Sequence, residues 1–171
     1  MSIENDTNSA LSCEFGTPSI DQSEHLIPVL QYLPGFGCQS YWRLLEASNG
    51  MDALFSLPLD YLLKCLPAQA RTGFRLLYQQ REQCEYWKRY CDDWARLNEL
   101  DVTLITHLDA RYPASLSNIT TAPPQLYVLG SVELLNKPQL AFVGSRQPTP
   151  SGADIAFEFA GVLGRSGLAI C

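Results

Sequence analysis

From Asp21 onward, apolar residues recur at spacings of three and four, the pattern of helices that bury one face. The first predicted helix ends at the turn LPGFG, residues 33–37, and a second helical pattern starts at Tyr41. A short helix is predicted over 59–65 and the longest over 72–99. We expect one apolar stripe of the longest helix to lie in the core: Cys84, Trp87, Cys91 and Trp94.

The pattern changes near residues 98–101, where helical spacing gives way to short β-branched runs. Strands are predicted at VTLITH (102–107) and LYVLG (126–130), separated by a connection that contains several prolines. A third strand at 140–143 is apolar throughout, so it is expected to be buried in a parallel sheet. The remaining predicted elements are a helix at about 150–165 and a strand at 168–171.

These elements predict a fold of class α + α/β. A helical domain, similar to SAM and helix-hairpin-helix domains, is expected at residues 21–100. The first part of a Rossmann-like parallel sheet domain is expected at residues 101–171. Residues 1–20 are polar and without periodicity, so they are interpreted as a disordered tail.

Charge is unevenly distributed along the 171 residues, whose formal net charge is −6. Residues 1–60 hold eight carboxylates and a single basic residue, Arg43, whereas residues 61–100 hold seven basic and five acidic residues. This balance excludes a protein that coats duplex DNA by charge alone, and any site for a polyanion has to be local.

The sequence contains neither a metal signature nor an apolar run of the ~20 residues that a membrane span needs. His25 and His107 are isolated from other ligands at metal-binding spacing, and no cofactor is expected. The N-terminus lacks the features of a signal peptide. A cytoplasmic protein with reduced cysteines and no membrane partner is therefore predicted.

Two glycines in the turn at 33–37 form a first candidate phosphate site. Gly35 and Gly37 expose backbone N–H groups beside a helix N-terminus, as in helix-hairpin-helix contacts with DNA phosphates. The same spacing occurs at any sharp turn between helices, and the nearest basic residue is Arg43. A structural turn is therefore the favoured interpretation, and a weak backbone contact with DNA is the alternative.

The segment GSRQPTPSG, residues 144–152, is the second candidate. Gly144 lets a ligand approach the backbone, Thr149 followed by Pro150 is typical of a helix start, and Arg146 can grip phosphate with two hydrogen bonds. Neither a Walker A loop nor the dinucleotide fingerprint is present. An ordinary strand-to-helix connection is the alternative to phosphate binding by Gly144, Ser145, Arg146, Thr149, Ser151 and Gly152.

Three motifs together resemble the family of the DNA-processing protein DprA, also called Smf. They are Tyr112-Pro113 with Leu116, then Pro123-Pro124 with Leu126-Tyr127 and Gly130, then Val143-Gly144-Ser145-Arg146 with Thr149 and Gly152. Their combination over about 60 residues is more specific than any single glycine motif. The predicted helical domain at residues 21–100, which contains LPGFG, is similar to the family's N-terminal domain.

The resemblance implies a protein of natural transformation, competence and DNA uptake. Such a protein binds single-stranded DNA with a Rossmann-like domain, protects it and helps to load RecA for DNA recombination, without an established catalytic role. Arg146 is the implied contact with DNA phosphate. Because the family continues beyond the second strand of this domain, the chain is expected to be a fragment. It would lack the rest of the DNA groove, the homodimer surface and the RecA contact.

Two other functions stay open. A nucleotide-processing enzyme similar to the lysine-decarboxylase-like phosphoribohydrolases would need a Pro-Gly-Gly-x-Gly-Thr segment and a catalytic glutamate, and this chain shows neither. The third possibility is a structural fragment whose helical domain docks another protein.

Overall fold

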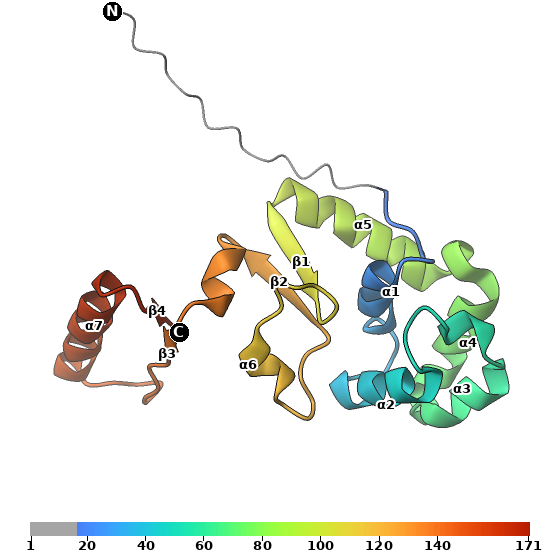
Figure 1. Cartoon of the computed structure of the whole chain (residues 1–171), viewed down its shortest axis with the longest axis horizontal. Coiled ribbons are helices and arrows are strands. Elements are labelled where there is room, and N and C mark those ends of the chain that lie inside the picture. The colour runs from blue at the N-terminus through green and yellow to red at the C-terminus, as the bar shows by residue number, and fades with distance from the viewer. Residues whose placement is uncertain (1–16) are drawn as a thin grey trace, which may run out of the picture.

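The computed structural model describes residues 17–171. Most of the predicted tail at 1–20 therefore lies outside the described residues, and its last residue, Ile20, is buried in the core. The helical part comprises α1 (Ser23–Leu30), α2 (Cys38–Ser48), η1 (Leu54–Ser56), α3 (Leu59–Cys65), η2 (Ala68–Ala70), α4 (Arg71–Gln80), η3 (Arg81–Gln83) and α5 (Glu85–Glu99) (Figure 1).

Two separate two-stranded sheets follow the helical part among the described residues. The elements are β1 (Val102–Thr106), α6 (Ala114–Ser117), β2 (Gln125–Leu129), η4 (Val132–Asn136), β3 (Gln139–Leu140), α7 (Pro150–Arg165) and β4 (Ala169–Ile170). β1 and β2 pair antiparallel, whereas β3 and β4 pair parallel with α7 as the crossover between them. The predicted class, α + α/β, is confirmed.

The core lies among α1 to α5, because each of these helices turns an apolar face inward. Ile27, Leu44 and Phe74 are completely buried there. The predicted apolar stripe is confirmed as core. Cys84 and Trp87 are buried, and Cys91 and Trp94 are half-buried against the same cluster.

The single long helix predicted over 72–99 is wrong. The chain forms α4 and α5 with a break at Arg81, whose φ of 52° and ψ of −123° are not helical. The guanidinium of Arg81 lies 3.3 Å from the ring centroid of Phe55. This cation–π contact stabilises the non-helical backbone at Arg81. Because the segment between the helices contains neither proline nor glycine, the local sequence gives no sign of the break.

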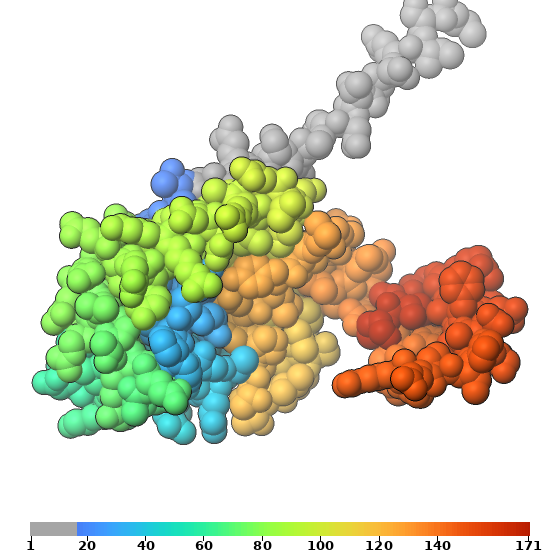
Figure 2. Space-filling view, turned by 180° about the vertical axis from the view of Figure 1, so that it is seen from behind, coloured from blue at the N-terminus to red at the C-terminus, as the bar shows by residue number. Residues whose placement is uncertain are grey.

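The hairpin β1–β2 packs on the helical part. Ile105 is buried, the Tyr41 hydroxyl hydrogen-bonds Nε2 of His107, and Trp42 Nε1 donates to the Ala122 carbonyl at 2.7 Å. Figure 2 shows the hairpin closely against the helices, while the segment from β3 to β4 stands apart as a separate lobe. The first strands after the helices therefore extend the core of the helical part.

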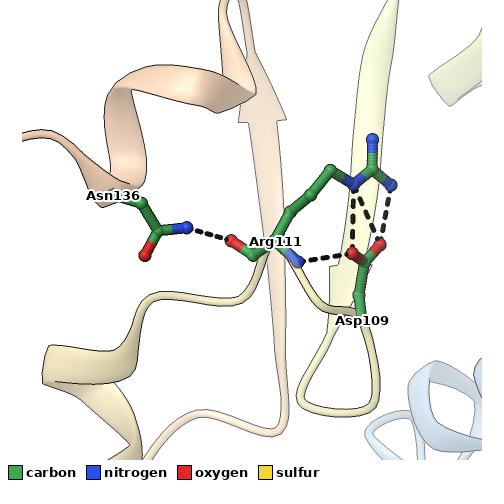
Figure 3. A network of polar contacts seen from close by, with 3 residues as sticks. All are labelled: Asp109, Arg111 and Asn136. Atoms are coloured by element: carbon green, nitrogen blue, oxygen red, sulfur yellow. Dashed lines mark hydrogen bonds and ion pairs between the residues drawn. The ribbon is translucent and has the colours of Figure 1, made fainter.

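A small polar network links the hairpin to the segment that leads to β3 (Figure 3). Arg111 pairs with both carboxylate oxygens of Asp109, and its Nη2 lies 2.6 Å from Oδ2. This guanidinium lowers the pKa of Asp109 below its ordinary value. Asn136, at the end of η4, donates to the Arg111 carbonyl at 2.8 Å. The network fixes the end of η4 against the β1–β2 connection.

Candidate nucleic-acid interface

The loop between β3 and α7 contains most of the predicted phosphate-binding residues. The predicted buried strand at 140–143 is wrong in length and burial, since β3 ends at Leu140 and Val143 is 93% exposed. Phe142 N still donates to the Cys171 carbonyl at 2.7 Å, so pairing with the β4 side continues for a short distance. Among the described residues, β4 is the only strand beside β3, and residues 141–143 are all exposed, Phe142 to 37% and Val143 to 93%.

The start of α7 is formed as the sequence predicts. Thr149 is the N-cap, its Oγ1 accepts from Gly152 N at 3.2 Å, and Pro150 occupies the first turn. Ala153 N donates to the Thr149 carbonyl. Within the described residues this leaves Ser151 N–H as the first-turn donor without an acceptor.

Arg146 is exposed in the middle of the loop, and its guanidinium has no acceptor or ion-pair partner among residues 17–171. Ser145 Oγ accepts from Gln147 N at 3.1 Å, which closes a tight polar turn around Arg146. The loop thus presents one fixed turn, one unpaired guanidinium and the positive end of the α7 dipole on the same exposed segment.

Gly144 in the loop and Gly152 in the first turn of α7 differ in their structural role. A Cβ added to Gly152 would lie 3.0 Å from Thr149 Oγ1, so glycine there protects the helix cap. A Cβ added to Gly144 would meet nothing within 4 Å, and the φ of Gly144 is not in the left-handed region. The folded chain therefore gives no steric reason for glycine at position 144.

The turn glycines of the first candidate site lie in the helical part, in the connection from α1 to α2. Gly35 has a φ of 69°, and a Cβ there would lie 2.4 Å from Oε1 of Gln69. Gly37 is the extended N-cap of α2. The conformation and packing of Gly35 account for a glycine without any ligand, which favours the structural interpretation of this turn.

One pocket, which contains two tyrosines and two charged residues, was not predicted from the sequence. A pocket of about 340 Å³ lies between the end of α1, α5 and β2, and its lining residues are Tyr32, Asp93, Arg96, Leu97, Leu100 and Tyr127. Tyr32 and Asp93 are 61 positions apart, and their contact depends on how α1 packs against α5. A helical face with Asp93, Arg96, Leu97 and Leu100 at spacings of three and four was the only local signal.

The described residues hold no group of three or more His, Cys, Asp or Glu side chains that could bind a metal ion. The cysteines in this part of the chain are free thiols: Cys38, Cys65, Cys84, Cys91 and Cys171. Within residues 17–171, no helix is both long enough and apolar enough to cross a membrane.

The structure is thus that of an α + α/β protein with an exposed, arginine-containing loop at the start of a crossover helix. Residues 103–171 match the family model of DNA recombination-mediator protein A, so this segment of the chain is similar to that family. The resemblance seen in the sequence motifs is thereby confirmed. No curated protein matches the chain.

One solved structure similar to the chain is the X-ray structure of DNA processing protein A (DprA) from Streptococcus pneumoniae. The sequences are 27% identical, and the TM-score is 0.48. The match covers 77% of this chain and 42% of that one, so the chain spans less than half the length of that protein.

Proposed function

We propose that this chain acts in DNA recombination by binding single-stranded DNA at the loop between β3 and α7. The observation that carries the proposal is the exposed, unpaired guanidinium of Arg146 beside the N-terminus of α7. Guanidinium groups and helix N-termini are both suited to phosphate, and the electrostatic contact needs no particular base sequence.

The predicted site residues have complementary roles in this proposal. Arg146 grips a phosphate, Ser151 N–H and the helix dipole favour a second negative oxygen, and Gly144 leaves room for the sugar-phosphate backbone. Ser145, Thr149 and Gly152 hold the loop and the cap in place. A contact by Gly35 and Gly37 is not needed.

We also propose a more specific role for this chain, which is supported by its resemblance to the DprA family. The protein would protect incoming single-stranded DNA during natural transformation and help to load RecA. It would act as a cytoplasmic homodimer in its full length and without a catalytic step. The boundary near residue 100, between the helical domain and the Rossmann-like domain, is likewise part of this proposal.

Fluorescence anisotropy with labelled oligo-dT tests the loop. Arg146→Ala should weaken binding by about 1.5–3 kcal/mol, the range for hydrogen bonds to charged groups. The slope of log K against log salt should decrease by about 0.7, the value for one phosphate contact of a single strand. Arg165→Ala is the matched control, since Arg165 lies in the last turn of α7 and not at its start.

Equal affinities of the parent chain and Arg146→Ala would contradict the proposal. AMP hydrolysis measured on the same sample tests the nucleotide-processing alternative. Release of adenine without oligo-dT binding would favour that enzyme class instead.

A further inference from the structure

The pocket between α1, α5 and β2 has two aromatic walls and a polar floor. Tyr32 follows the end of α1, and Tyr127 lies in the middle of β2 and is 49% exposed. Leu97 and Leu100 complete an apolar rim, and Leu100 is 65% exposed. The volume of about 340 Å³ falls within the range of small-molecule sites.

The polar floor offers one hydrogen-bond acceptor and one donor. Tyr32 OH donates to Oδ2 of Asp93 at 2.5 Å, and the structure shows no partner for Oδ1 of Asp93 among the described residues. Tyr127 OH accepts from Gln125 Nε2 at 2.9 Å, so the phenolic proton of Tyr127 is still available to a ligand.

The two phenols stay protonated at neutral pH. Burial raises the pKa of Tyr32, and the hydrogen bond and negative charge of Asp93 raise it further. Burial also raises the pKa of Tyr127, with a smaller contribution from the charge of Asp93. The carboxylate of Asp93 is thus the hydrogen-bond acceptor of the pocket, and the N–H groups at the edge of a nucleobase can donate to it.

Two guanidinium groups lie at or beside the pocket, together with the carboxylate of Asp93. Arg96 lines it and has no ion-pair partner within residues 17–171. Arg89, nearly two turns earlier on α5, lies 4.9 Å from the ring centroid of Tyr32. These two guanidinium groups oppose a cationic ligand such as a lysine or arginine side chain of a partner, and they favour a ligand that has a phosphate next to a planar ring.

We propose that this pocket binds one unstacked base of a single-stranded nucleic acid, with the adjoining phosphate on Arg96. The base stacks against Tyr127, and an N–H group at its edge donates to Oδ1 of Asp93. The inference rests on the proposed function, because the strand bound here is the one bound by the loop before α7. Figure 1 shows α5 ending beside the hairpin, from which the chain leads through η4 to β3.

Photo-crosslinking tests the pocket directly. An oligo-dT that contains 5-iododeoxyuridine is irradiated with the whole 171-residue chain, and the crosslinked peptides are identified by mass spectrometry. We expect crosslinks at Tyr127 or Tyr32. Crosslinks that avoid both tyrosines, in a sample that still binds oligo-dT, would overturn the inference and leave the proposed function standing.

Affinity measurements give an independent result. Tyr127→Ala should weaken oligo-dT binding by about 5- to 150-fold, the range for losing one stacked base. Tyr127→Phe keeps the ring and should retain most of the affinity, and the crosslinking result decides the matter if the alanine variant fails to fold. Tyr61→Ala is the matched control, because Tyr61 is a tyrosine of similar exposure, 46%, outside the pocket.

The two proposals fail in different ways. If Arg146→Ala weakens binding while Tyr127→Ala binds like the parent, the pocket is not a base site. If neither substitution changes the affinity, single-strand binding by this chain is itself wrong. A Tyr127→Ala chain that binds oligo-dT poorly, beside an unchanged Tyr61→Ala chain, supports the pocket.

Discussion

The helical part with its hairpin and the lobe from β3 to β4 differ in how far their apolar side chains are buried. The former buries most of its large apolar side chains, whereas no described residue after Pro124 is buried. Phe157 and Phe159 on α7 are 82% and 60% exposed, in contrast to Phe74, which is completely buried. Burial, the main source of folding free energy, is therefore concentrated in the first region.

The hydrogen bonds follow the same division. Side chains of the first region bond across long stretches of sequence, as Tyr41 does with His107 and Trp42 with Ala122. In the second region the side-chain bonds of Ser145 and Thr149 reach only two or three residues along the chain. The first region has a shared core, whereas the second is a locally capped loop and helix in which the guanidinium of Arg146 has no partner among residues 17–171.

The largest expected effect compares one aromatic residue from each region. Trp87 is buried and packs beside Tyr90, so Trp87→Ala should lower the free energy of unfolding by about 3–5 kcal/mol. Phe157→Ala removes a side chain that is 82% exposed and should change it by less than about 0.5 kcal/mol. Urea unfolding followed by circular dichroism measures both.

Equal losses in the two variants would contradict the division into regions. An unchanged urea midpoint in Trp87→Ala would mean that the indole is not part of the core.

Helix positions were largely predictable because periodic apolar residues determine them. The helix at 59–65 and the start of α7 at Pro150 have the predicted bounds, since proline and a capping threonine mark them in the sequence. The break at Arg81 was not predictable, because it depends on a cation–π contact with Phe55, 26 positions away. Tertiary contacts of this kind leave no local pattern.

A smaller effect is expected from a comparison of two glycines. Gly35 has a φ of 69° and contacts Gln69, so Gly35→Ala should cost about 1–3 kcal/mol of stability. Gly144→Ala introduces a methyl group into open space and should change stability by less than about 0.5 kcal/mol while weakening oligo-dT binding. Unfolding midpoints and anisotropy, measured on the same two variants, separate the two roles.

If Gly35→Ala is the variant that loses DNA affinity at unchanged stability, the turn between α1 and α2 is the phosphate site. If Gly144→Ala binds like the parent, the open space at position 144 has no part in binding.

The candidate site was predictable only in part. Gly144, Arg146 and Thr149 stand close together in the sequence, so a loop motif could identify them. The pocket of Tyr32, Asp93 and Tyr127 could not be found this way, because its residues come from three elements that meet only after folding. The burial predicted for 140–143 was wrong because an apolar strand is buried only where other elements cover it.

The smallest expected effect is a pH dependence confined to the first region, which contains both histidines. Burial lowers the pKa of His25, and Glu24 opposes this shift; burial also lowers the pKa of His107. As pH falls through the ordinary value of 6.5, the unfolded chain binds protons that the folded histidines resist, so the free energy of unfolding falls. The urea midpoint should therefore be lower at pH 5.5 than at pH 7.5, and His107→Asn should reduce the difference. The window lies above the range of Asp109, whose pKa is already lowered from 3.8, so this carboxylate does not contribute. A midpoint that is unchanged or higher at pH 5.5 would mean that the histidines are not held neutral by the core and that the contrast between the regions does not extend to protonation.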